Sequence, residues 1–251
     1  MDLRVADGYK SPAQRARRLT EDWFGRNMYC PVCPSDRLGS TRSNTRVVDF
    51  QCQRCGAEFQ VKARGGPFGA RLRDAAYAPM MQRATSGTSP HFAFLQYRRD
   101  DWRVCALFLV PGHFITPDVI EKCTPLSPRA RRAGWVGCNI LASAIPTDGR
   151  VGVVERSRIV NPGEVRMAWS RFDWMAGRSA DSRGWMMDVL RCVRSLGAKE
   201  FSLDAIYAFE GELAGQHPRN MNIRPKIRQQ LQVLRDHGIL RFLGRGRYAV
   251  I

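Results

Sequence analysis

The sequence has no long apolar run and no apolar segment at its N-terminus. Its hydrophobic stretches fall well short of the roughly 18 residues that a membrane-spanning helix needs. Residues 1–7 interrupt their apolar side chains with charged ones, unlike the apolar core of a secretion signal. Heptad repeats and an obvious dimer seam are also absent. These absences argue against a membrane or secreted protein, and we expect a monomer in the cytoplasm.

Acidic residues are scarce relative to basic ones. Lys and Arg together number 40 against 23 Asp and Glu, which gives a formal net charge of +17 at pH 7. A surface with this excess attracts polyanions, and nucleic acid is the first candidate. General stickiness towards polyanions and an arginine-biased genome remain as alternative explanations. The composition therefore favours a protein that binds nucleic acid.

Four of the eight cysteines form two closely spaced pairs. Cys30/Cys33 and Cys52/Cys55 follow the pattern C-x2-C-x18-C-x2-C, which is typical of a structural zinc ion held by four thiolates. Two disulfides or unpaired core thiols fit less well, because nothing else in the sequence indicates an oxidising compartment. The remaining cysteines lack pair spacing and are expected to be small buried hydrophobes: Cys105, Cys123, Cys138 and Cys192.

An aspartate and a Gln-x-Lys tripeptide flank the second cysteine pair. Asp49 ends one strand-like run, and Gln60 and Lys62 follow in the next, after ten intervening residues. This is the layout of PD-(D/E)XK nucleases, in which Asp49 and the carbonyl oxygen of Gln60 would hold Mg²⁺ while Lys62 positions or activates the attacking water. Strand alternation places Gln60 and Lys62 on one face. The string alone is weak evidence, since an ordinary amphipathic strand gives the same pattern.

Residues 1–180 and 181–251 are predicted to form separate domains, because the periodicity weakens before the start of the second part. In the first part, residues 74–83 predict a helix. The continuous apolar runs at residues 91–95 and 104–110 predict strands that are buried on both faces. This mixture indicates an α/β (α+β) nuclease-like domain that contains the zinc site.

The second part shows the pattern of a winged helix. Three helical stretches, the last over residues 224–237, precede a hairpin whose basic tip is residues 244–246. Three side chains of the third helix point away from its apolar stripe and are candidates for reading a DNA groove: Arg228, Gln229 and Gln232. The hairpin tip adds Arg245 to these candidates. Docking to another protein through the same domain is the alternative.

Four segments together resemble a known family. They are residues 19–31 (LTEDW and YCP), 49–62, 130–139 (ARRAGWVGCN), and 226–236 (KIRQQLQVLRD) with GRG at 244–246. Over nearly its full length the chain resembles the DpnI-type methyl-directed restriction endonucleases. The resemblance implies a zinc-stabilised PD-(D/E)XK domain and a C-terminal winged helix, both of which recognise duplex DNA with N6-methyladenine in 5′-GATC. It also implies cleavage of the methylated sequence alone.

The resemblance carries over to particular residues. Asp49 and Lys62 match catalytic positions, and the four paired cysteines match the zinc ligands, but Gln60 stands where the family has Glu. An amide has one unit of negative charge less than a carboxylate, so the affinity for Mg²⁺ should fall, although an amide oxygen remains an acceptable ligand. Gln60 is either a functional variant, which we favour, or the mark of a slow or dead centre. The alternative function is therefore a non-catalytic reader of methylated DNA or a transcription regulator.

An arginine-rich loop contains the candidate methyl reader. N6-methylation replaces a hydrogen-bond donor in the major groove with a small apolar group, so its recognition requires an apolar or aromatic contact. Trp135 is our candidate for that contact, and Arg131 and Arg132 suit phosphates or guanine edges. The alternative is that Trp135 only anchors the loop to its own core.

Overall fold

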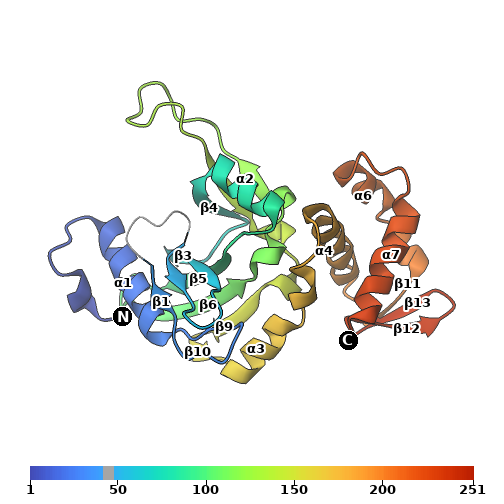
Figure 1. Ribbon diagram of the computed structural model, residues 1–251, viewed down its shortest axis with the longest axis horizontal. Coiled ribbons are helices and arrows are strands. Elements are labelled where there is room, and N and C mark those ends of the chain that lie inside the picture. The colour runs from blue at the N-terminus through green and yellow to red at the C-terminus, as the bar shows by residue number, and fades with distance from the viewer. Residues whose placement is uncertain (42–47) are drawn as a thin grey trace.

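The computed structural model describes residues 1–41 and 48–251, and this part of the chain contains three β-sheets (Figure 1). In the seven-stranded sheet β3 and β5 run parallel, and the other neighbouring strands run antiparallel. Its strands, in sheet order, are β1 (Gly39–Ser40), β2 (Phe50–Gln51), β3 (Glu58–Gly65), β5 (His91–Tyr97), β6 (Val104–Val110), β9 (Val151–Glu155) and β10 (Arg158–Ile159). The predicted mixed α/β class is confirmed.

The large sheet separates two apolar clusters. Successive residues of β5 alternate between them, as Phe92 and Ala93 do, because side chains of a strand point to opposite faces in turn. Helices α1 (Pro12–Asn27) and α3 (Pro162–Ser170) pack on the Ala93 face, and the short turn η1 (Leu3–Ala6) contacts α1. Across the residues described, no helix combines the length and apolarity needed to cross a bilayer.

The opposite face carries a second sheet of three strands and helix α2. Its strands are β4 (Arg71–Ala76), β8 (Gly137–Leu141) and β7 (Ile120–Lys122), with β8 in the middle. Because α2 (Tyr77–Ser86) begins directly after β4, the helix predicted over residues 74–83 is wrong at its first three positions. Short 3-10 turns complete this part: η2 (Gly112–Phe114), η3 (Pro117–Val119), η4 (Ala142–Ala144), η5 (Thr147–Gly149) and η6 (Asp173–Met175).

The C-terminal part is a winged helix, as the sequence predicts. Its elements are α4 (Ala180–Ser195), β11 (Glu200–Ser202), α5 (Leu203–Tyr207), α6 (Glu210–Gln216), α7 (Ile223–Asp236), β12 (Leu240–Gly244) and β13 (Arg247–Val250). Ser202 caps α5, because its hydroxyl accepts a hydrogen bond from the N–H of Ala205 (3.2 Å). The hairpin tip, residues 244–246, has φ angles of 92°, 47° and 71°, a left-handed conformation that favours glycine at its two ends. The sequence did not predict β11 or α6.

Helix α4 joins the two parts of the chain. One apolar cluster runs from the second sheet through α4 to α7. Arg183 of α4 is fully buried and donates to the carbonyl oxygens of His113 (3.0 Å) and Ala84 (3.1 Å), both in the first part. The boundary at residue 180 stays a prediction, and the shared core makes α4 a structural element of both parts.

We expect Arg183→Ala to lower the free energy of unfolding by about 2–4 kcal/mol, since it removes two buried hydrogen bonds and leaves a cavity beside α4. Urea unfolding followed by circular dichroism measures the change. Arg241→Ala, at an exposed position of β12, is the control and should stay within about 0.5 kcal/mol of the unchanged chain. Equal stability of the two variants would contradict a joining role for Arg183.

Candidate functional site

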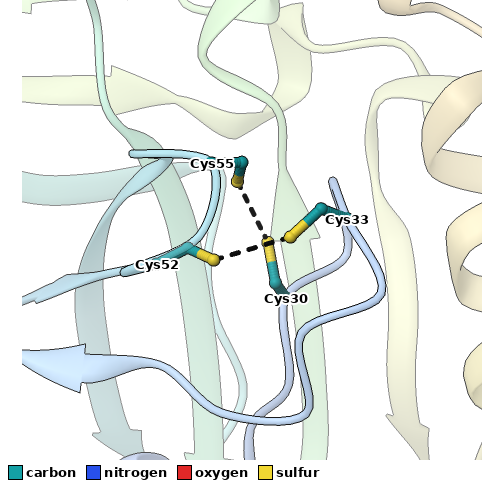
Figure 2. A group of neighbouring side chains, drawn as sticks. All are labelled: Cys30, Cys33, Cys52 and Cys55. Atoms are coloured by element: carbon teal, nitrogen blue, oxygen red, sulfur yellow. Dashed lines mark hydrogen bonds between the residues drawn. The ribbon is translucent and has the colours of Figure 1, made fainter.

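The two cysteine pairs meet in space (Figure 2). Cys30 and Cys33 lie in the loop after α1, and Cys52 and Cys55 lie in the turn between β2 and β3. The four Sγ atoms all lie within 4.8 Å of one another, with 3.7 Å between Cys30 and Cys55 and 3.6 Å between Cys33 and Cys52. The predicted grouping is confirmed, and the cluster could hold a zinc ion.

The dimensions and chemistry of the cluster fit a closed zinc site. Four sulfurs at about 2.3 Å from one zinc ion lie about 3.8 Å apart, close to the two separations given above. Burial opposes ionisation of Cys52, but hydrogen bonds from the backbone N–H groups of Cys55 and Arg54 outweigh it and lower the pKa of this thiol to about 6. Burial raises the pKa of the Cys30 thiol. Four sulfur ligands complete the tetrahedron, so an ion held there would be structural.

The turn at the second cysteine pair sets the register of β2 on β3. Phe50 lies opposite Phe59, and the N–H of Asp49 donates to the carbonyl oxygen of Phe59 (2.9 Å). Two residues further along β3, the N–H of Val61 donates to the side-chain Oδ2 of Asp49 (2.8 Å). In a continuing β-ladder this N–H would donate to a backbone carbonyl oxygen instead. The Asp49 carboxylate thus ends the β2–β3 ladder beside Gln60.

Asp49, Gln60 and Lys62 line one cleft between α1 and β3. The cleft has a volume of about 440 Å³, and α1 adds Arg17 and Glu21 to its wall. Gln60 is only 7% exposed, and its Oε1 has no hydrogen-bond partner among the described residues. A buried acceptor of this kind has a lone pair free to coordinate a cation or to accept from a water molecule. The structure therefore brings the three predicted residues together, and their roles stay predictions.

Lys62 also contacts a residue that the sequence did not single out. Its ammonium forms an ion pair with Asp74 of β4, whose side chain is fully buried. Asp74 fell among the residues predicted to be helical. In the structure exposed Arg71 and Arg73 alternate with buried Leu72 and Asp74, a strand pattern that the sequence hides because Asp74 is charged.

The arginine-rich loop between β7 and β8 projects from the body of the protein (yellow-green in Figure 1). Arg131 and Arg132 are exposed, and Trp135 is partly buried. The Arg132 guanidinium lies 4.6 Å from the centroid of the Trp135 ring. That ring lies against Gly137, where a β-carbon would come within 2.8 Å of it. Trp135 thus packs on the backbone at the base of the loop without being fully enclosed, and its role stays a prediction.

The winged helix presents the other predicted DNA-binding residues on its surface. Arg228, Gln229 and Gln232 are exposed on α7, and Arg245 is exposed at the hairpin tip. Arg228 Nη1 donates to the hydroxyl of Tyr207 at the end of α5 (3.1 Å). Tyr207 thus orients Arg228, and no local pattern in the sequence predicts this contact between two helices.

A large mixed sheet with an Asp-Gln-Lys cleft and a four-cysteine cluster, joined to a winged helix, defines a nuclease-like DNA-binding protein. Residues 1–176 match the sequence profile of DpnI, described as the Dam-replacing family, and residues 181–250 match that of its Dam-replacing HTH domain. The chain therefore belongs to the DpnI, or Dam-replacing, family, as its sequence segments predict. Membership supports a methylation-dependent restriction endonuclease.

We expect elemental analysis to find about one zinc ion per chain, because the four sulfurs form a closed site. Cys52→Ser should lose the metal and yield unstable or insoluble protein, since a closed site contributes directly to folding. Cys105→Ser, outside the cluster, is the matched control and should keep both metal and solubility. A metal-free chain as stable as the zinc-loaded one would contradict this prediction.

Proposed function

We propose that this protein is a Mg²⁺-dependent type II restriction endonuclease that hydrolyses phosphodiester bonds of duplex DNA at 5′-GATC sites carrying N6-methyladenine. The observation that carries the proposal is the cleft in which Asp49, Gln60 and Lys62 meet, in a chain of the DpnI family. A monomer as the active species and structural zinc in the cysteine cluster are part of the proposal.

The oxygen atoms of the cleft fit a hard divalent cation. Asp49 and Gln60 would hold Mg²⁺, which prefers oxygen ligands, and the orphaned Oε1 of Gln60 supports this assignment. The chemistry that Mg²⁺ supplies when bound is stabilisation of negative charge on the scissile phosphate. Because Gln60 is neutral, the site should need more Mg²⁺ than one with Glu at this position.

Lys62 supplies positive charge at the same cleft. Its side chain is 21% exposed, and partial removal from water strengthens its interaction with a phosphate. Its ammonium would orient the attacking water by hydrogen bonding and stabilise the charge that develops on the phosphate. Lys62 acts from a strand, so its backbone position is fixed by the sheet.

The winged helix supplies one of two surfaces for DNA. Helix α7, the last helix before the hairpin of this HTH domain, would be the recognition helix that enters the major groove. Arg228 suits the acceptor edge of guanine, and Gln229 and Gln232 suit adenine, because their side chains offer two hydrogen-bonding atoms at the required spacing. Arg245 at the hairpin tip suits a phosphate.

The projecting loop of the nuclease part supplies the second surface. The solvent-facing part of the Trp135 ring would contact the N6-methyl group, since that group offers no additional hydrogen-bond donor. Arg131 and Arg132 would bind phosphates or guanine edges beside it. The two surfaces give the protein two independent contacts with the methylated sequence.

Digestion of plasmid DNA tests the proposed function directly. Plasmid from an adenine-methylating host should be cut at GATC in the presence of Mg²⁺, and plasmid from a non-methylating host should stay intact. Gln60 in place of an acid favours one other candidate, a non-catalytic reader of methylated DNA. Binding of the methylated duplex without cutting would support that reader and contradict the endonuclease.

Substitutions in the cleft test the assignment of the centre. We expect Asp49→Ala to lower the single-turnover rate at least about 100-fold, because loss of a metal ligand removes several kcal/mol of transition-state stabilisation. Gln60→Glu should lower the Mg²⁺ concentration needed for half-maximal rate, since it adds an anionic ligand. Gln82→Glu makes the same charge change at an exposed position of α2 and should leave that concentration unchanged. Full cleavage by Asp49→Ala would exclude this centre.

Substitutions on α7 test DNA reading by the winged helix. In a full-length Asp49→Ala background, Arg228→Ala and Gln229→Ala should each weaken binding of a methylated GATC duplex by about 1–3 kcal/mol. Gel-shift titration with paired methylated and unmethylated duplexes measures the effect. Arg235→Ala, on the same helix but ion-paired to Asp236, is the control and should change affinity little. Equal affinities for Arg228→Ala and the control would remove α7 from the recognition surface.

A further inference from the structure

A buried acid faces the candidate centre from the second sheet. The side chain of Asp74 on β4 is fully buried. Among the described residues, neither of its carboxylate oxygens accepts a conventional hydrogen bond. Its ion-pair partner is Lys62, on β3 of the large sheet. The contact therefore bridges two sheets and ends at the wall of the cleft.

Burial makes the two side chains depend on each other. An ionised carboxylate that has left water is strongly disfavoured unless a cation or hydrogen-bond donors lie beside it. Lys62 is the basic residue that the described chain brings within ion-pair distance of Asp74. In return, the carboxylate restrains a long flexible side chain that has many other rotamers open to it. Asp74 thereby fixes the direction in which Lys62 points.

The backbone around Asp74 directs its side chain inward. The pairing of β4 with β8 shifts register between Arg73 and Ala76, which is the mark of a β-bulge. Bulges re-aim side chains and are frequent beside functional sites. A contact from the neighbouring β8 holds β4 at this bulge, because the thiol of Cys138 donates to the carbonyl oxygen of Ala75 (3.5 Å). Asp74 is therefore set in a rigid frame before any ligand binds.

We propose that Asp74 is a positioning residue that holds the ammonium of Lys62 at the cleft shared with Asp49 and Gln60, so that the cleavage rate depends on Asp74 through Lys62. The effect on cleavage rests on the proposed function, whereas the Asp74–Lys62 pair rests on the structure alone. The side chain of Asp74 is enclosed by protein, so its proposed role runs through Lys62.

Single-turnover cleavage of a methylated GATC duplex at saturating Mg²⁺ tests the role in the reaction. We expect Asp74→Asn to lower the rate about 100-fold, the loss that misplacement of a reacting group produces. Affinity for the duplex should stay the same. Glu58→Gln is the matched control, because Glu58 lies on the same strand as Lys62 and its change removes a different ion pair, the one with Arg83 of α2.

Thermal unfolding of the zinc-loaded chain tests the pair without reference to cleavage. Lys62→Met leaves a buried carboxylate without its cation, so its Tm should fall below that of the double variant Lys62→Met/Asp74→Asn. Additive Tm shifts would overturn the proposal. So would an Asp74→Asn chain that cuts at the wild-type rate while the Lys62→Met chain cuts nothing.

If the unchanged chain cuts no methylated DNA, the proposed function fails. Non-additive unfolding would then still support Asp74 as the residue that orients Lys62.

Discussion

The turn that contains Cys52 and Cys55 is the constraint on which the geometry of the nuclease part depends. It connects β2 to β3 and places two of its side chains in the four-cysteine cluster. A turn clamped in this way fixes the register that sets Phe50 opposite Phe59. That register in turn brings the Asp49 carboxylate to the end of the ladder, beside Gln60. A structural cluster thus determines the geometry of the candidate centre.

Two ion pairs balance charge in the cleft. Asp74 neutralises Lys62 from the second sheet, and Glu21 pairs with Arg17 on α1 (2.6 Å). With a neutral Gln60, the Asp49 carboxylate supplies the anionic ligand that the β2–β3 ladder brings to a cation. The neutral side chain of Gln60 therefore affects how much Mg²⁺ the centre needs. The β2–β3 pairing around it does not depend on a negative charge at residue 60.

Local patterns predicted the parts of the structure that depend on neighbours in the chain. Cysteine spacing found the cluster, and helical periodicity found α7 with the hairpin that follows it. The errors lie where pairing is long-range. The sequence predicts a helix at Asp74, whereas β4 forms there by pairing with the distant β8. Strand β11, which the sequence does not predict, pairs with β13. The burial of α4 by both parts of the chain, and the reach of Lys62 to Asp74, are tertiary contacts that no local window contains.

We propose above that Asp49 and Gln60 form a cation site in the cleft between α1 and β3. The most direct measurement is electron paramagnetic resonance of Mn²⁺, an oxygen-preferring stand-in for Mg²⁺, titrated into the zinc-loaded chain with a methylated GATC duplex. We expect a bound Mn²⁺ signal that Asp49→Ala abolishes and Gln60→Glu strengthens. The same bound signal in the unchanged chain and in both variants would exclude a cation site at these two residues.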